Sequence, residues 1–147
     1  MILSQTALYA LRAMAILSRG GVDGARVRGA ELAMEGQIPS FYISKVMREL
    51  VRAGLVDGLR GHGGGFRLAR APAEIKLAEI LEAAEWTEEV GVCAFGIGRC
   101  NPAEPCSLHF AWNGLQGSVL HWAHTHTLEA LQTEPPRQVG PPERDVG

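Results

Sequence analysis

All three cysteines of the 147-residue chain lie in one short stretch, CAFGIGRCNPAEPCSLH, which runs from Cys93 to His109. Six residues separate Cys93 from Cys100, five separate Cys100 from Cys106, and His109 follows three positions after Cys106. Thiolate sulfur and imidazole nitrogen are common ligands of zinc and iron in proteins. Three thiols and one imidazole therefore make a complete set of four ligands for a metal centre.

Three kinds of chemistry are compatible with this spacing. A structural zinc site commonly uses three cysteines and a histidine, but it favours CxxC pairs, and the stretch contains none. The wider gaps suit an iron–sulfur cluster, whose ligands lie further apart. A thiol switch that forms a disulfide on oxidation is the third interpretation. The spacing favours the cluster and leaves zinc and the thiol switch open.

The residues that follow the cysteines predict a long helix over 107–131. Pro105 suits a first helical turn, which would place Cys106 and His109 on one face near the positive end of the helix dipole, where a thiolate is favoured. Apolar residues recur along this helix at steps of four, three, four and three. This seam predicts dimerisation with a second copy of the chain. Its members are Leu108, Trp112, Leu115, Val119 and Trp122.

The charges of the chain are divided unevenly. Residues 1–70 carry ten Lys or Arg and five acidic residues, a net charge of +5. Residues 71–147 carry four basic and eleven acidic residues, a net charge of −7. A basic half predicts that this end of the molecule meets a polyanion.

The basic half has the element order of a winged helix-turn-helix domain. An apolar stripe beginning near Ser4 predicts a first helix, and a short helix follows over 30–35. Ser40 can cap a helix over 41–53 that Gly54 ends. Two short extended runs, 55–59 and 66–69, flank a glycine-rich turn and predict a β-hairpin. The predicted fold is therefore mainly α, with a winged helix-turn-helix domain and a long C-terminal dimerisation helix.

The polar face of the helix over 41–53 and the tip of the hairpin form the candidate DNA-binding surface. Recognition helices read base edges in the major groove, whereas wings contact phosphates or the minor groove. The predicted DNA-binding residues are Ser40, Phe41, Tyr42, Ser44, Lys45, Arg48, Arg60, His62, Gly63, Gly64 and Arg67.

The predicted organisation divides the chain into five parts. Residues 1–72 form the winged domain, 73–92 a connecting helix and linker, 93–106 the cluster-binding loop, 107–131 the dimerisation helix and 132–147 a disordered tail. No membrane span and no convincing signal peptide are present, so we expect a cytoplasmic protein. A redox enzyme or electron carrier is disfavoured, since the sequence shows no nucleotide motif and no substrate-pocket signature.

These motifs resemble the bacterial Rrf-type family of winged-helix repressors, over about residues 1–131. The resemblance is carried by LSQTALYALRAM, by ISKVMRELVRAGLVDGLRGHGGGFRLAR and by the three-cysteine loop. Within the family, Cys-Ser-Leu-His followed by Trp112 is most similar to the IscR branch, and the NsrR branch, which senses nitric oxide, is the alternative. The resemblance implies a homodimeric transcription factor that reads a palindrome. It also implies a [2Fe–2S] cluster on Cys93, Cys100, Cys106 and His109, with [4Fe–4S] as the alternative.

The sequence departs from the family pattern at three places. The first cysteine gap is one residue longer than in the IscR branch. Some relatives take a ligand from the first helix of the other subunit, but Ser4, Gln5, Leu8 and Arg12 offer no acid or histidine there. This favours His109 as the fourth ligand and leaves Glu104 as an alternative. Ser44 replaces a glutamate that helps the IscR branch choose its DNA sites, so those target sequences are not transferred.

Overall fold

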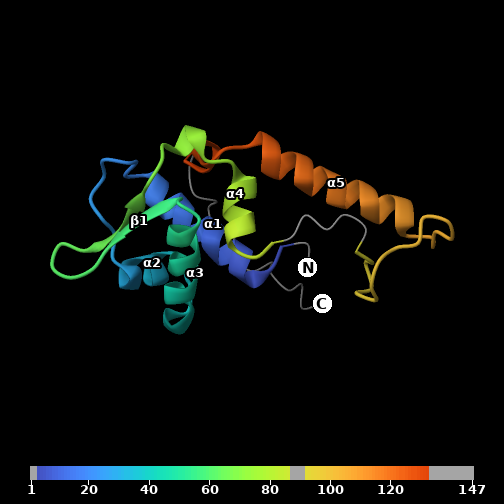
Figure 1. Ribbon diagram of the computed structural model, residues 1–147, viewed down its shortest axis with the longest axis horizontal. Helices are drawn as coiled ribbons and strands as arrows, with labels where there is room; N and C mark the ends of the chain where they lie inside the picture. Colours follow the sequence, from blue (N-terminus) through green and yellow to red (C-terminus); the bar gives the residue numbers. More distant parts are fainter. Residues whose placement is uncertain (1–2, 87–91, 133–147) are drawn as a thin grey trace, which may run out of the picture.

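The computed structural model describes residues 3–86 and 92–132, and the predicted tail over 133–147 lies outside these ranges. Figure 1 shows a winged domain at one end and the cysteine segment at the other, joined by a protruding helix. The helices and strands are α1 (Gln5–Ser18), α2 (Gly29–Glu35), α3 (Ser40–Arg52), β1 (Val56–Leu59), β2 (Gly65–Leu68), η1 (Pro72–Glu74), α4 (Leu77–Ala83), α5 (His109–Thr125) and η2 (Leu128–Leu131). No helix among these residues is both long and apolar enough to cross a membrane.

Helix α1 lies at the centre of the winged domain. The hydroxyl of Ser4 accepts a hydrogen bond from the Ala7 amide at 3.1 Å, so the predicted N-cap is confirmed. Ala7, Ala10 and Met14 are fully buried, as the apolar spacing predicts. The small alanines let neighbouring helices approach closely, and α1 contacts α2, α3 and α4.

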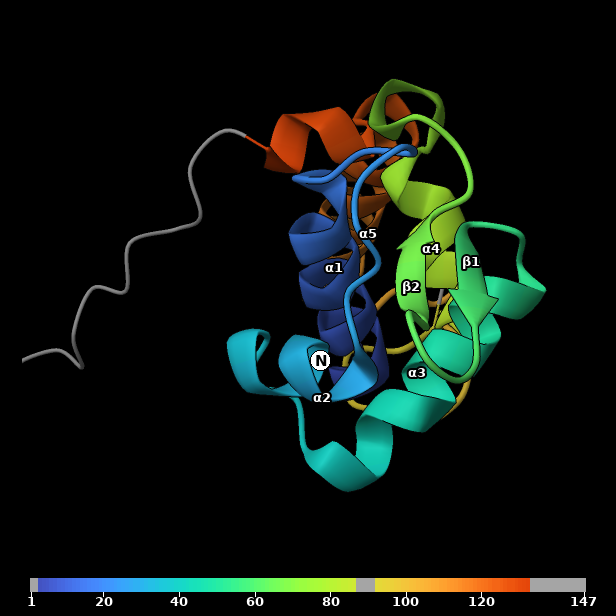
Figure 2. The same ribbon diagram turned by 90° about the vertical axis from the view of Figure 1, so that its left-hand side faces the viewer.

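Helix α3 packs one side against α1 and leaves the other exposed. The predicted inward residues Ile43, Val46, Met47 and Leu50 are all buried. The helix begins at Ser40, one residue earlier than predicted, and Gly54 follows its end with a φ of +75°, a conformation that favours glycine. Figure 2 shows α3 below the hairpin on the side of the molecule that faces the viewer.

The hairpin pairs β1 with β2 in antiparallel register, from Val56 opposite Leu68 to Leu59 opposite Gly65. A third segment widens this small sheet, because Val27 exchanges two main-chain hydrogen bonds of 2.8 Å with Phe66. The winged helix-turn-helix domain is therefore present as predicted.

Helix α5 is shorter than the predicted range of 107–131. It begins at His109 and ends at Thr125, because the chain then turns to pair with the start of α4. Thr127 bridges Lys76, and the Leu77 amide donates to the His126 carbonyl at 3.0 Å. This pairing fixes the C-terminal end of α5 to the winged domain.

Candidate functional site

The segment that begins at Cys93 folds into a narrow turn. Val92 pairs with Arg99 in an isolated bridge, and the Cys93 amide donates to the carbonyl of Gly98 at 2.9 Å. The Gly96 amide donates back to the Cys93 carbonyl, also at 2.9 Å. Gly96 and Gly98 have φ values of +71° and +82°, so glycine is needed at both positions to close the turn.

The three thiols lie close enough to influence one another. Partial burial raises the pKa of the Cys100 thiol above its usual value, and the charges of Cys93 and Cys106 raise it further. A hydrogen bond with Cys93 acts in the same direction. Neighbouring thiolates repel each other, and a bound cation would remove this repulsion. The three side chains thus offer the soft sulfur donors that iron–sulfur clusters and zinc require.

His109 lies beside this group but is held by its own helix. Its ring is buried, and its Nε2 lies 3.1 Å from the side-chain Nδ2 of Asn113. The side-chain oxygen of Asn113 is buried without a hydrogen-bond partner among the described residues. Within those residues no three Cys, His or acidic side chains already stand in metal-ligand geometry. The role of His109 as fourth ligand therefore stays a prediction, as does the alternative, exposed Glu104.

The predicted position of Cys106 within the long helix is wrong. Cys106 lies in the turn before α5, three residues ahead of its first residue, and its carbonyl accepts from the His109 amide at 3.1 Å. The two residues are therefore joined by a turn and not by a shared helix face. The structure nevertheless keeps Cys106 next to the beginning of α5.

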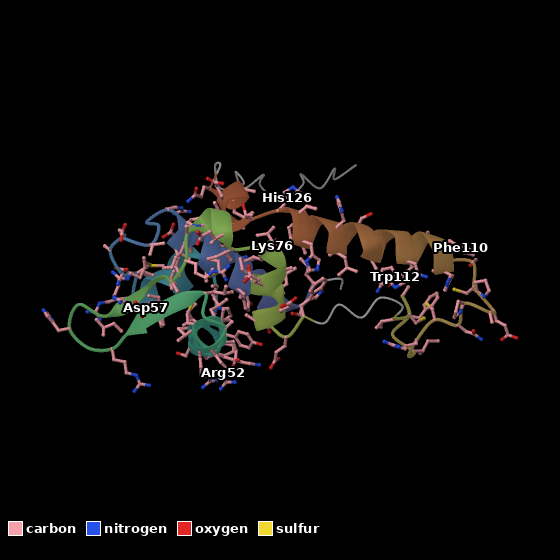
Figure 3. All side chains as sticks on the ribbon, turned by 45° about the horizontal axis from the view of Figure 1, so that its top comes forward. Arg52, Asp57, Lys76, Phe110, Trp112 and His126 are labelled. Carbon is pink, nitrogen blue, oxygen red and sulfur yellow. The ribbon has the colours of Figure 1, made fainter. Side chains whose placement is uncertain are left out.

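Trp112 joins the cysteine segment to α5. Its indole nitrogen donates to the carbonyl of Val92 at 2.6 Å, immediately before Cys93. Figure 3 places Trp112 and Phe110 at one end of the molecule, far from Arg52 and Asp57 in the winged domain. Trp112 therefore fixes where the cysteine segment lies on the helix.

The predicted dimerisation seam is only partly exposed. Leu108 and Leu115 are exposed, whereas Trp112, Val119 and Trp122 are half-buried against their own chain. Phe110, which the seam does not include, is 77% exposed. The exposed apolar side chains are therefore two members of the predicted seam and Phe110, which lies five residues before Leu115 and so on another face of α5.

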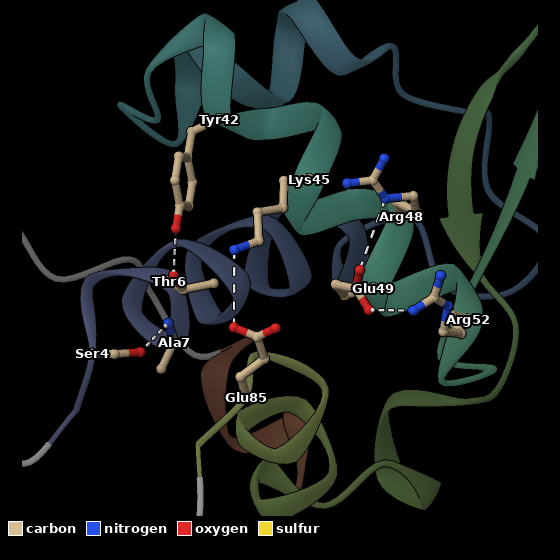
Figure 4. A network of polar contacts seen from close by, with 9 residues as sticks. All are labelled: Ser4, Thr6, Ala7, Tyr42, Lys45, Arg48, Glu49, Arg52 and Glu85. Carbon is tan, nitrogen blue, oxygen red and sulfur yellow. Dashed lines mark hydrogen bonds and ion pairs between the residues drawn. The ribbon is translucent and has the colours of Figure 1, made fainter.

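The outer face of α3 is polar and basic at most positions. Ser40 and Ser44 are exposed, and the side chains of Arg48 and Arg52 are exposed beside Glu49, which contacts both. These contacts are shown in Figure 4. Both are surface ion pairs, which contribute little energy and exchange readily for phosphate. The arginines are therefore available to a polyanion.

Lys45 carries a contact that the sequence did not indicate. Its ammonium lies 3.9 Å from the carboxylate of Glu85, just beyond α4, and 5.7 Å from the centre of the Tyr42 ring. Glu85 has a φ of +61° and lies on the segment that leads from the winged domain toward Cys93. A predicted DNA-binding residue thus touches the connection to the cysteines.

Tyr42 belongs to the same predicted set, but its side chain faces α1. Its hydroxyl hydrogen-bonds the hydroxyl of Thr6 at 2.7 Å, and its ring packs edge-on against Tyr9 with centroids 5.6 Å apart. Figure 4 shows the Tyr42 hydroxyl directed at Thr6. Tyr42 therefore positions α3 on α1.

The wing presents Arg60, His62 and Gly63 at an exposed tip. Gly64 is buried, and a Cβ there would lie 2.4 Å from the Leu59 carbonyl oxygen, so a larger residue would force the turn apart. Arg67 is half-buried. The glycines of the tip thus serve first to close the turn.

Arg26 lies outside the wing and binds Asp57 of strand β1. The sequence did not indicate this contact. The Arg26 guanidinium donates to the Asp57 carboxylate at 2.6 Å and to the Asp57 carbonyl at 2.9 Å. The hydrogen bond from Arg26 lowers the pKa of Asp57, and the charge of Arg67, 3.5 Å away, adds to this effect. An isolated arginine in a loop gives no signal from which this contact could be predicted.

A basic helix and a basic hairpin tip on one side of a small helical domain define a winged helix-turn-helix DNA-binding protein. The model of the Rrf2 family, described as an iron-dependent transcriptional regulator, matches residues 3–134. The chain belongs to the Rrf2 family of transcriptional regulators, whose members bind DNA, and its named homologues are transcriptional regulators.

Several named relatives align over most of the chain. The HTH-type regulator IscR of Cereibacter sphaeroides is 34% identical over 127 residues, covering 85% of this chain and 81% of that protein. NsrR of Geobacillus kaustophilus is 30% identical and covers 84% of each chain. Among solved structures, CymR, the global cysteine regulator of B. subtilis, shares the fold with a TM-score of 0.72 at 22% identity, covering 88% of this chain and 95% of CymR. T. potens IscR has a TM-score of 0.66 at 23% identity, covering 95% and 92%.

Proposed function

We propose that the protein is a cytoplasmic, homodimeric repressor-type regulator whose DNA binding responds to an iron–sulfur cluster, most simply [2Fe–2S]. Cys93, Cys100 and Cys106 would hold the cluster, and His109 would be the fourth ligand. The observation that carries the proposal is the gathering of all three cysteines in one segment that folds back on itself, where the Cys93 amide donates to the Gly98 carbonyl. Likeness to proteins named IscR and NsrR supports it.

The cluster would supply a centre whose presence and oxidation state depend on iron supply and on oxidants. The residues of the chain would position the cluster ligands. The turn at Gly96 and Gly98 brings Cys93 and Cys100 together, and Trp112 holds this turn on α5. His109 would have to release Asn113 before its Nε2 could serve as a ligand.

The signal would reach the DNA-binding surface along two connections. Glu85 lies where the chain leaves α4 toward the cysteines and contacts Lys45 of α3. The far end of α5 is fixed to the start of α4 by the pairing of Thr127 with Lys76. A change in the cysteine segment would thereby alter the charge near α3 and the separation of the two recognition helices in a dimer. That separation must match half-sites about one DNA turn, or a multiple of it, apart.

Dimerisation would use the exposed apolar side chains of α5. Leu108 and Leu115, two members of the predicted seam, are exposed in the single chain, and apolar surface of this kind is covered in a twofold interface. Trp112, Val119 and Trp122 would contribute from the edge of this surface. The predicted partners are therefore a second copy of the chain and a palindromic operator.

The first experiment is purification without oxygen, followed by a visible absorption spectrum and assays of iron, sulfide and zinc. Matching iron and sulfide with visible charge-transfer bands is the expected result, and the band shape separates [2Fe–2S] from the [4Fe–4S] centre of a nitric-oxide sensor. Cys100→Ser should abolish the bands and change operator affinity, whereas Ser107→Ala, in the same segment, should do neither. One zinc per chain would make the site structural, and metal-free protein with an oxidant-induced disulfide would make it a thiol switch. Either result would end the cluster proposal.

A further inference from the structure

We infer that Phe41 reads the C5-methyl group of a thymine in the major groove of each operator half-site. This inference rests on the proposed operator recognition and adds to it a base that one residue specifies. Phe41 is the second residue of α3, and the first residues of a recognition helix are those that approach base edges.

The Phe41 side chain is 83% exposed, the largest exposed fraction among the exposed large hydrophobic residues of the described chain. A single exposed apolar residue is common on protein surfaces and indicates little by itself. The surroundings of Phe41 make it specific. The exposed neighbours on the same face are the hydroxyls of Ser40 and Ser44 and the guanidinium of Arg48. Phe41 is thus one apolar group in a surface otherwise suited to a polyanion.

The Phe41 ring contacts the side chain of the next residue, Tyr42. Phe41 packs edge-on against Tyr42, with ring centroids 6.2 Å apart and planes at 90°. Tyr42 is in turn fixed by its hydrogen bond to Thr6 and by its contact with Tyr9. This contact favours some orientations of the Phe41 ring over others, which lowers the conformational entropy that the ring loses when it enters a groove.

The chemistry of the ring limits what it can recognise. A phenyl group neither donates nor accepts a conventional hydrogen bond, so it cannot distinguish the donor and acceptor pattern of a base pair. The thymine methyl is the one apolar group that the standard base pairs expose in the major groove. A Phe41 ring brought to the floor of the groove would therefore select thymine over cytosine by contact with that methyl.

The test begins with selection of sequences from a pool of random DNA duplexes, using the untreated full-length protein. Each thymine of the selected half-site is then replaced singly by deoxyuridine, which removes only the methyl group. Burial of one methyl is expected to change affinity about fourfold per half-site, or about fifteenfold when both half-sites are changed. At one thymine position of the half-site, the affinity of Phe41→Ala should no longer depend on the methyl group. Phe41→Leu should retain part of this dependence.

Phe110→Ala is the matched control, because Phe110 is also highly exposed but lies on α5. It should leave the pattern of deoxyuridine sensitivity unchanged, whatever its effect on overall affinity. Thermal melting of each variant checks folding. The inference is overturned if sequences are selected but no deoxyuridine effect depends on Phe41, or if the half-site contains no thymine. If no sequence is selected at all, operator recognition fails and the inference fails with it.

Discussion

The hydrogen bond from Trp112 to Val92 should determine how firmly the cysteine segment is held on α5. Trp112→Phe keeps an aromatic ring in the half-buried position but removes the indole donor. The bond is 2.6 Å long and partly buried. A bond of this kind contributes about 1 kcal/mol net, since water replaces part of what is lost. Detachment of the segment should therefore become about fivefold more frequent.

Hydrogen exchange of the metal-free protein, resolved by residue, measures this detachment directly. The amides of Cys93 and Gly96, which close the turn, should exchange about fivefold faster in Trp112→Phe, because local opening controls their exchange. Amides in the middle of α3 should be unaffected. Trp122→Phe, the same substitution further along α5, serves as the control. Equal exchange in the turn, or acceleration spread evenly over the molecule, would refute the role given to Trp112.

Two further predictions concern the winged domain. The pKa of Asp57 is lowered by the hydrogen bond from Arg26, so this contact stabilises the fold above the usual pKa of an aspartate and is lost as the pH falls through the lowered value. Asp57→Asn should therefore melt at a lower temperature than the natural protein near neutral pH, with the difference vanishing in acid; a difference that persists at low pH would contradict this account. Glu85→Gln should release Lys45 and tighten binding to operator DNA about twofold to fivefold, because a carboxylate near the phosphates is removed. Titration of labelled operator at fixed salt measures this, and Glu82→Gln, on α4 itself, should bind as the natural protein does.

The winged domain was predictable because its helices bury their apolar stripes within one chain. Ile43, Val46 and Leu50 face the core at the spacing a helix requires, and the hairpin is marked by its glycines. Helix α5 shows the limit of this reasoning. Its spacing cannot distinguish packing on the same chain from packing on a second copy, and its end at Thr125 depends on pairing with residues near Lys76, far away in the sequence.

The sequence indicates which residue types belong to the candidate sites, but it does not indicate how their side chains are arranged. The cysteine segment folds back on itself at Gly96 and Gly98, and the ligand set stays a prediction, whereas the burial of His109 against Asn113 follows from helix geometry that spacing does not reveal. On α3, Phe41 and Tyr42 are adjacent aromatic residues, and the sequence does not indicate which of the two side chains is buried. Only the structure shows that Tyr42 is fixed on α1 and Phe41 is exposed.

The pairing of Thr127 with Lys76 has a mechanical consequence. The chain departs from the winged domain after α4 and rejoins it at the start of that same helix, so the excursion that carries the cysteines is anchored at both ends. Helix α5 forms its rigid arm, about 25 Å long for 17 residues. A displacement at the tip of this arm would therefore be transmitted along α5 to the end that is paired with Lys76. That end pairs with the start of α4, which contacts both α1 and α3, so the displacement would reach the helices of the winged domain.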